Sequence, residues 1–227
     1  MPRKAAPHPA AVAKEPRKLS EQRRDQIVRA AVQLFSDRGY FPTTIEDIAN
    51  EVNVSKGLIY LYFKDKNDLL FYALRFVLER FGSEVLPQLR RSHSPLAALR
   101  GALRAYCRLA NDYRFEHELA YRATRDLPRK QRLHIKVEET KIWRVFRNYL
   151  EACIHRGFMV PVNLDIMAYQ YIMLAHQWAL KNWAFRDKYA FEDYLADGEK
   201  ILIDSFLTEE GRKLSEEPPQ ALTKERR

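Results

Sequence analysis

The amino-acid sequence predicts an all-α protein with a small N-terminal domain and a larger C-terminal one. Its 227 residues include only seven glycines, too few for a protein of this size built from sheets and turns. Apolar side chains recur every three or four residues through most of the chain, the spacing of a helix face. The chain exceeds one small helical module by about a hundred residues or more, so a second domain with its own core is expected.

The first residues predict an arm followed by a helix. Residues 1–19 hold four prolines among Ala, Lys and Arg and few large apolar groups, so we expect a disordered basic arm, either a solvated tail or a segment that lies along a polyanion. From Ser20 a helical pattern begins, and Gly39 is expected to end the helix as its C-cap. Its apolar stripe comprises Ile27, Val28, Ala31, Leu34 and Phe35.

Residues 43–63 predict two short helices joined by a tight turn. Thr43 or Thr44 can cap the first helix, because each has an acidic residue three positions later. Asn53 tolerates the backbone conformation that a turn needs. The face of the first helix that is expected to be buried holds Ile45, Ile48 and Ala49.

The second of these helices is expected to begin after Ser55, whose hydroxyl can cap it. Leu58 and Ile59 should then face the first helix, which leaves an outward face with Lys56, Tyr60 and Tyr62. This arrangement is a helix-turn-helix, and its outward face is what the major groove of DNA would meet. With the helix from Ser20 it completes a three-helix domain over residues 20–64.

Residues 65–207 predict the larger domain. Asp65 can cap a connecting helix that continues towards Pro87. Lys64 and Lys66, beside the free amides at the start of this helix, suit a phosphate group. Further helices are expected over residues 95–112, 114–126, 129–156, 163–187 and 190–207, because proline, glycine and charged residues separate these segments. Residues 208–227, rich in Glu, Pro and Lys, predict a flexible tail.

Charge and chemistry limit the function classes. A net charge of +9 indicates a polyanionic partner, yet residues 25–63 carry three Lys or Arg against five Asp or Glu, so the helix-turn-helix is not basic. Nucleophile motifs, phosphate-binding loops, paired catalytic carboxylates and metal-ligand spacings are missing from the sequence, so we expect no enzyme, cofactor or metal. Two distant cysteines and the lack of a long apolar run favour a reduced, cytoplasmic protein without a membrane span.

The segments "AAVQLFSDRGY" (residues 30–40) and "TTIEDIANEVNVSKGLIYLYFKDKNDLL" (residues 43–70) closely resemble the TetR/AcrR family of bacterial transcriptional regulators. Apolar positions, Gly39, the threonine pair and the Ser-Lys-Gly sequence all stand at the family's spacing. The resemblance implies a homodimer that binds a palindromic double-stranded DNA operator through two recognition helices, with repression as the commoner mode. It also implies a C-terminal domain that holds the dimer interface and a cavity for a small-molecule inducer.

By position, the resemblance assigns DNA contacts to a set of polar residues, most of which would touch phosphate and fix register without selecting sequence. Leu61 departs from the Tyr or His of many members, and could exchange a polar contact for an apolar one with a thymine methyl group. The residues expected at the DNA are Thr44, Ser55, Lys56, Gly57, Tyr60, Leu61, Tyr62, Lys64 and Lys66.

The implied effector cavity would be lined by aromatic and Met residues, although core packing explains each of them equally well. His176 is interpreted as a hydrogen-bonded core or dimer residue. The last two helices, over residues 163–187 and 190–207, are assigned to the dimer interface by position. The candidate cavity residues are Tyr106, Tyr121, Trp143, Phe146, Tyr149, Met173 and Trp178.

Nine Lys and Arg residues fall between positions 122 and 147, including Arg122, Arg125 and Arg129. They form either a solvated helix face or a mouth that holds the phosphates of an acyl-CoA thioester. "ELAYRATRDLPRK" and "AHQWALKNW" resemble stretches of family members that govern fatty-acid or related acyl-CoA degradation. A hydrophobic, drug-like or aromatic inducer and a ligand-independent architectural DNA-binding protein are the alternatives.

Overall fold

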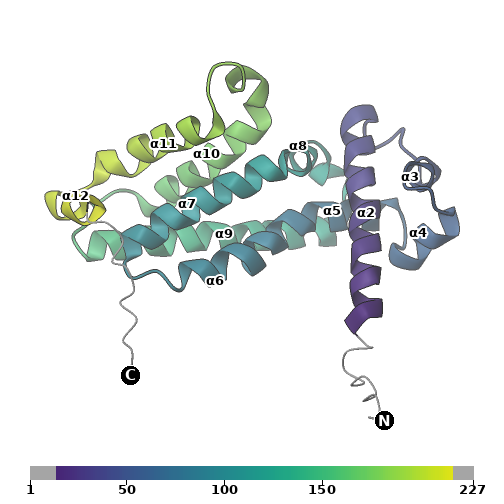
Figure 1. The fold of residues 1–227 in the computed structure, drawn as a ribbon, viewed down its shortest axis with the longest axis horizontal. Helices are drawn as coiled ribbons and strands as arrows, with labels where there is room; N and C mark the ends of the chain where they lie inside the picture. Colours follow the sequence, from purple (N-terminus) through teal and green to yellow (C-terminus); the bar gives the residue numbers. More distant parts are fainter. Residues whose placement is uncertain (1–13, 217–227) are drawn as a thin grey trace, which may run out of the picture. The chain divides into compact units, whose positions relative to one another are not determined.

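A computed structural model describes residues 14–216 and confirms the all-α prediction. Nearly all of these residues lie in helices, and one isolated bridge between Met159 and Leu207 is the single strand-like pairing among them (Figure 1). In chain order the elements are α2 (Lys14–Arg38), α3 (Ile45–Glu51), α4 (Lys56–Tyr62), α5 (Lys66–Arg80), η1 (Phe81–Val85), α6 (Leu86–Leu89), α7 (Pro95–Asp112), α8 (Arg114–Ala123), η2 (Thr124–Asp126), α9 (Arg129–His155), α10 (Leu164–Phe185), α11 (Phe191–Leu202), η3 (Asp204–Phe206) and α12 (Glu209–Glu216).

The chain divides into two compact units. The N-terminal unit extends to Arg75 and also takes in Glu118–Arg132, and the second comprises Phe76–His117 and the chain from Leu133 onward. The predicted boundary after residue 64 therefore moves into α5. Sequence patterns locate helices but do not indicate which distant segments pack together. They therefore do not predict that Glu118–Arg132 belongs to the first unit.

The N-terminal unit is built on α2. Ile27, Val28, Ala31 and Phe35 are buried, as their spacing predicts. Gly39 adopts a φ of +91°, a left-handed conformation that glycine reaches without steric cost, and its N–H donates to the carbonyl of Phe35 at 3.0 Å. The helix ends where the sequence predicts, and the chain turns directly towards α3.

Two segments for which the sequence predicts disorder or flexibility are helical. The first helix begins at Lys14 rather than Ser20, so the last part of the predicted arm is helical; residues 1–13 lie outside the described part. The predicted tail from residue 208 contains α12, and residues 217–227 are not described. Helix α12 is anchored because Gly211 is buried against the carbonyl oxygen of Phe158, a contact between residues far apart in the chain.

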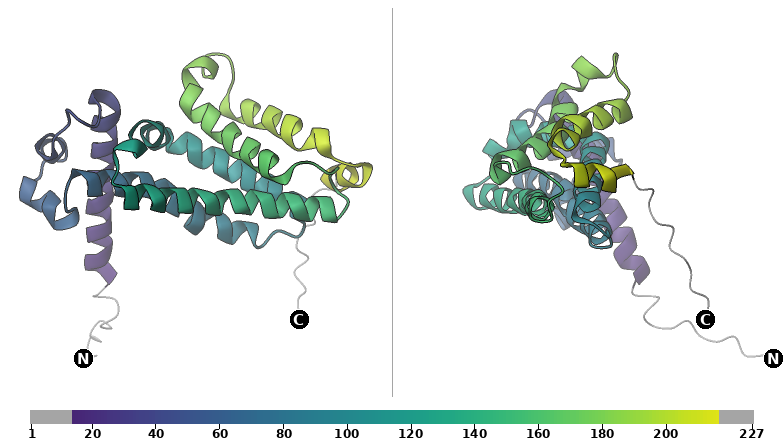
Figure 2. Two further views of the ribbon diagram at one scale, coloured as in Figure 1. Left: turned by 180° about the vertical axis from the view of Figure 1, so that it is seen from behind. Right: turned by 90° about the vertical axis from the view of Figure 1, so that its left-hand side faces the viewer.

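In the second unit α7 and α10 lie side by side along much of their length (Figure 2). The predicted connecting helix forms and contains a π-helical segment: α5 ends at Arg80, η1 follows it directly, and α6 follows η1. Helix α10 has a kink at Lys181, where φ is −117° and ψ is 22°. Arg100 and Arg104 of α7 both bind the buried carboxylate of Glu199, which links α7 to α11.

Replacing Gly211 with alanine tests how α12 is held. A Cβ at Gly211 would lie 2.1 Å from the Phe158 carbonyl oxygen, so Gly211→Ala should destabilise the protein by about 1–3 kcal/mol in thermal unfolding. Gly82→Ala is the matched control, because a Cβ there meets no atom within 4 Å. Equal melting temperatures for the two variants would contradict the packed position of α12.

Candidate nucleic-acid interface and effector core

Reciprocal hydrogen bonds fix the start of α3. The Thr44 hydroxyl oxygen accepts a hydrogen bond from the Asp47 amide at 3.1 Å, and an Asp47 carboxylate oxygen accepts from the Thr44 amide at 2.7 Å. The Thr44 hydroxyl also donates to this carboxylate at 2.7 Å, and the hydrogen bonds from the Thr44 hydroxyl and amide lower the pKa of Asp47. Thr44 is thus the cap, whereas Thr43 is buried and its hydroxyl donates to the Gly39 carbonyl at 2.8 Å.

The turn between α3 and α4 forms as the sequence predicts. Asn53 has a φ of 53°, and in the described chain it is the one residue other than glycine with positive φ. The Ser55 hydroxyl accepts a hydrogen bond from the Leu58 amide at 3.2 Å and caps α4. Ile45, Ile48 and Ile59 are buried, and α4 is thereby held against α3 with its opposite face outward.

The outward face of α4 carries most of the residues predicted to meet DNA. Tyr60 is 49% exposed and Leu61 is 81% exposed, while Tyr62 is only partly exposed. Ser55, Lys56 and Gly57 are exposed at its N-terminus, as is Thr44 on α3. A Cβ at Gly57 would touch only the Ser55 hydroxyl, at 3.8 Å, so packing within the chain does not require glycine there. The bare backbone leaves room for a close partner.

Lys66, a predicted phosphate contact, makes hydrogen bonds within the chain that the sequence did not indicate. Its ammonium donates to the carbonyls of Tyr40, Phe41 and Thr43 at 2.8, 3.1 and 2.9 Å, which uses all three of its hydrogens. It also lies 4.3 Å from the centre of the Tyr40 ring, and burial lowers its pKa. Lys66 therefore fixes the turn between α2 and α3. Lys64, by contrast, is exposed.

A cluster of buried aromatic rings lies in the second unit. Tyr106 and Phe146, both predicted to line a cavity, are buried with ring centres 5.8 Å apart. Phe81 meets Tyr106 edge-on at 5.3 Å, and Tyr171 is 5.7 Å from Phe146. Each ring comes from a different element: Phe81 from η1, Tyr106 from α7, Phe146 from α9 and Tyr171 from α10.

Two histidines join this cluster. The Tyr106 hydroxyl and His176 Nε2 share a hydrogen bond of 2.7 Å, and the rings of His117 and His176 are 5.0 Å apart. Burial lowers the pKa of His176 to about 4, and burial together with His176 lowers that of His117 to about 3. The hydrogen-bonded core role predicted for His176 fits this contact. His117 was not singled out, since no spacing relates it to a partner so distant in sequence.

The other predicted effector residues are not all gathered at this cluster. Trp143 is partly exposed and packs on Tyr169 at 6.0 Å, and Met173 is exposed. Trp178 is buried, its indole N–H donates to Asn111 at 2.8 Å, and its ring packs with Phe191 and Tyr194 of α11. Exposed residues in the N-terminal unit make up the remainder: Tyr121, Arg122, Arg125 and Arg129.

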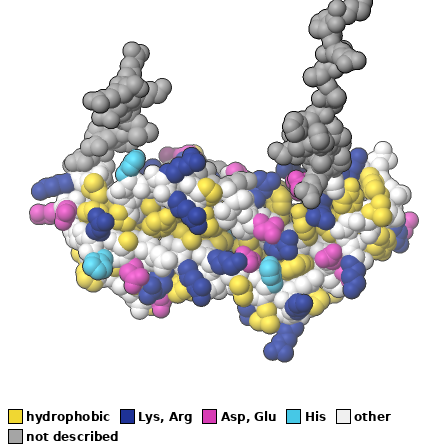
Figure 3. All heavy atoms as spheres, turned by 90° about the horizontal axis from the view of Figure 1, so that it is seen from below, with side chains coloured by type: hydrophobic (Ala, Val, Ile, Leu, Met, Phe, Trp, Pro, Cys, Tyr) yellow, Lys and Arg dark blue, Asp and Glu magenta, His cyan; other side chains and the backbone are white. Residues whose placement is uncertain are grey.

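The basic stretch is partly neutralised. Arg122 pairs with Glu118, Lys141 with Glu138, and Arg147 with both Glu151 and Asp165. Arg125 and Arg129 are exposed, and no ion pair involves them within residues 14–216. One face of the molecule shows Lys and Arg side chains scattered among acidic and hydrophobic ones rather than in a continuous patch (Figure 3).

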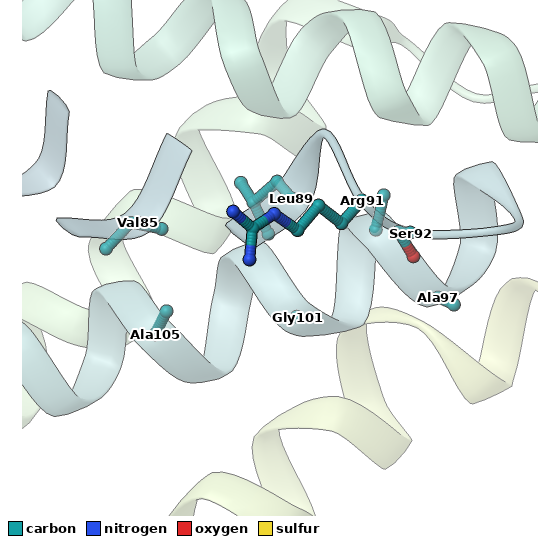
Figure 4. Close-up of a pocket in the computed structure, with 8 residues that line it drawn as sticks. Val85, Leu89, Arg91, Ser92, Ala97, Gly101 and Ala105 are labelled. Atoms are coloured by element: carbon teal, nitrogen blue, oxygen red, sulfur yellow. The ribbon is translucent and has the colours of Figure 1, made fainter. Parts of the chain in front are cut away.

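A surface hollow of about 260 Å³ lies between α6 and α7 in the second unit. The Arg91 side chain extends across the view between Leu89 and Ser92 (Figure 4). None of the predicted effector residues lines it. Its walls are Val85, Leu89, Arg91, Ser92, Ala97, Ala98, Gly101 and Ala105.

Comparison with known proteins decides the family. Residues 27–73 match the bacterial regulatory proteins of the tetR family. The transcriptional regulator HbdR of Aromatoleum sp. (strain CIB) is 42% identical over 204 residues, which cover 90% of this chain and 89% of HbdR. The chain belongs to the TetR family. It is therefore a DNA-binding transcriptional regulator and not an enzyme.

Other TetR-family regulators match along most of the chain. The fatty acid metabolism regulator protein of Bacillus subtilis is 25% identical over 168 residues, which cover 72% of this chain and 84% of that protein. A crystal structure of AibR in complex with isovaleryl coenzyme A and operator DNA superposes with a TM-score of 0.69 at 22% identity. The superposition covers 79% of this chain and 97% of AibR, and shows that the two share a fold over that part.

Sites that depend on neighbouring residues can be predicted from the sequence, whereas sites that depend on contacts between distant residues cannot. The predicted cap at Ser55 and turn at Asn53 depend on side chains acting on their own neighbours. The Lys66 contacts join residues more than twenty positions apart. A lysine near a helix N-terminus resembles a phosphate ligand equally well, so its sequence position did not indicate the role in the turn.

Salt dependence of DNA affinity distinguishes the two lysines. Log affinity falls as log salt rises, and Lys64→Met should make this slope less steep by about 0.9 per protomer if Lys64 contacts a phosphate. Lys66→Met should weaken operator binding by about tenfold or more with the slope unchanged, and should lower the melting temperature, because three hydrogen bonds to a charged group are lost. Fluorescence anisotropy across a salt series measures both.

If the slope of log affinity against log salt becomes less steep by the same amount in both lysine variants, Lys66 also contacts phosphate. Unchanged operator affinity in the Lys66 variant would show that the turn does not need this lysine.

Proposed function

We propose that this protein is a cytoplasmic, ligand-responsive repressor that binds a palindromic operator as a homodimer and is released by an acyl-CoA thioester. The outward face of α4, capped by Ser55 and held by buried Ile59, is the observation that carries the DNA-binding part. Recognition helices of a symmetric dimer meet half-sites about 34 Å apart or a multiple of that distance. The residues proposed at the operator are Thr44, Ser55, Lys56, Gly57, Tyr60, Leu61, Tyr62 and Lys64.

Leu61 is the proposed sequence-selective contact. It is the most exposed large apolar side chain among the described residues, and it stands between two tyrosines on α4. An apolar side chain in the major groove contacts the thymine methyl group, which other bases lack. The neighbouring polar contacts go to phosphate and set the register.

The homodimer is supported by apolar side chains that α10 leaves in solvent. Ile166, Tyr169 and Met173 follow one another at spacings of three and four residues, so they share a face. Trp183, beyond the kink, is 68% exposed, and Ile201 on α11 is 64% exposed. A second copy of this surface would cover these groups symmetrically.

The proposed coupling follows from helix continuity and linkage. Helix α5 begins with Lys66, which fixes the turn before α3, and is followed directly by η1, whose Phe81 belongs to the aromatic cluster. An effector that favours a different arrangement of the cluster would change the geometry available to α4. By reciprocity, the effector then weakens operator binding by the factor by which the operator weakens effector binding.

The effector class is supported by chemistry as well as by similarity. AibR was solved with isovaleryl coenzyme A and operator DNA, and the B. subtilis relative regulates fatty acid metabolism. In this chain, Arg125 and Arg129 offer cations for phosphates, and the cluster around Tyr106 and Phe146 offers apolar surface for an acyl chain. A neutral aromatic inducer is the second candidate, because the same cluster would suit it without any phosphate site.

Operator release tests the proposal. Isovaleryl-, octanoyl- and phenylacetyl-CoA, with free CoA as control, are titrated into protein bound to an operator that was selected from random duplexes. At least one thioester should dissociate the complex and CoA should not, since the acyl group carries the recognition. Release by a CoA-free aromatic molecule alone would favour the second candidate. Stable complexes with every compound would support a ligand-independent DNA-binding protein.

Charge reversal tests the phosphate site. The double variant Arg125→Glu and Arg129→Glu should weaken binding of the active thioester by about tenfold or more, because two cations become anions beside its phosphates. Operator affinity without effector should change by less than about threefold. Lys141→Glu is a control, because Lys141 is already paired with Glu138. Equal thioester affinity in all proteins would assign the basic stretch to a solvated helix face.

A further inference from the structure

We propose that His117 Nε2 donates a hydrogen bond to the carbonyl oxygen of the effector's acyl group, so that His117, His176 and Tyr106 form a polar recognition point within the aromatic cluster. This inference rests on the proposed effector class. It goes further by naming the group that would distinguish a thioester from other CoA derivatives.

The first support is an unpaired ring nitrogen. His117 is 6% exposed, and its Nε2 is buried without a hydrogen-bond partner. Leaving a buried polar atom unpaired costs about 1–3 kcal/mol, so such an atom calls for an explanation. Beside it, His176 and Tyr106 are joined by their hydrogen bond of 2.7 Å. The ring of His117 therefore offers a hydrogen-bonding position that this neighbouring pair does not fill.

The second support is the charge state of the cluster. Burial lowers the pKa of both histidines far below 7, so both rings are neutral under physiological conditions. A neutral imidazole carries one N–H donor and one acceptor nitrogen. A carboxylate buried beside neutral donors would lack a counter-charge, which is costly, whereas an uncharged carbonyl oxygen needs only the hydrogen bond. The site thus favours a thioester carbonyl over a free acid.

The third support is the surrounding surface. Phe81 and Phe146 are buried beside Tyr106, with ring centres 5.3 and 5.8 Å from it. These rings offer apolar contacts to an acyl chain on either side of the polar point. Because the rings contact one another, an acyl group that enters between them would displace a ring.

Phe81 is the ring whose displacement has the clearest consequence. It is the first residue of η1, and π-helical segments are rare and often occur at functional sites. A Cβ at Gly82, the next residue, would meet no atom within 4 Å, so this segment has space beside it. Movement of Phe81 would act directly on the end of α5, which precedes it in the chain.

Calorimetric titration of the full-length protein tests the inference. The probes are isovaleryl-, octanoyl- and phenylacetyl-CoA, and the thioether analogue of the tightest binder, in which CH₂ replaces the carbonyl. The proteins are the wild type, His117→Leu, His117→Gln and the exposed-site control His155→Leu. Leucine has no hydrogen-bonding group, whereas glutamine can place an amide N–H near the position of Nε2.

The wild type should bind the thioester about tenfold or more tightly than the thioether, and His117→Leu should lose that preference. His117→Gln should recover most of it, and His155→Leu should match the wild type. The melting temperature of His117→Leu should be equal to or above that of the wild type, because Nε2 makes no hydrogen bond within the chain and the substitution removes a buried unpaired polar atom.

Three results would overturn the inference: thioester affinity that is equal in wild type and His117→Leu, no binding of any of the three thioesters, or a melting temperature lowered by several degrees in His117→Leu. The last result would indicate that His117 holds a structural water instead. Operator release is measured separately. If a thioester binds through His117 but leaves DNA bound, the proposed function fails while this inference stands. If a thioester releases DNA equally from the wild type and all variants, this inference fails while the proposed function stands.

Discussion

The ammonium group of Lys66 is the interaction on which the DNA-binding surface depends. It holds three carbonyls of the turn between α2 and α3, and that turn places the Thr44 cap of α3. Because α4 packs on α3 through apolar residues, the position of its outward face follows from the same tie. Residues 25–63, which carry three Lys or Arg against five Asp or Glu, can then bind DNA through placed contacts instead of overall charge.

The candidate effector site in the second unit depends on buried aromatic and neutral polar side chains instead of a buried charge. The rings of its aromatic cluster are buried, and its two histidines are neutral at physiological pH. A ligand that supplied a partner for the unpaired Nε2 of His117 would gain the free energy of that hydrogen bond. Such a core suits a protein whose two states must differ in ligand affinity, since an effector shifts an equilibrium only through differential binding.

Local chemistry made part of this structure predictable from sequence. The cap at Ser55, the positive φ of Asn53 and the end of α2 at Gly39 each depend on a residue and its immediate neighbours. The packing of Gly211 on Phe158 and the meeting of His117 with His176 depend on tertiary contacts between distant segments. Helical spacing indicates that Tyr106 and Phe146 are buried but not which polar groups they surround. The candidate effector site was therefore predicted only in its aromatic part.

Reciprocity of binding tests the central claim most directly. The affinity of the active acyl-CoA is measured by calorimetry for free protein and for protein saturated with operator DNA, and the affinity for DNA is measured with and without that acyl-CoA. The account predicts that operator DNA weakens acyl-CoA binding by the same factor by which acyl-CoA weakens DNA binding, about 5-fold to 150-fold for typical coupling. Equal acyl-CoA affinity in the presence and absence of operator DNA would contradict it.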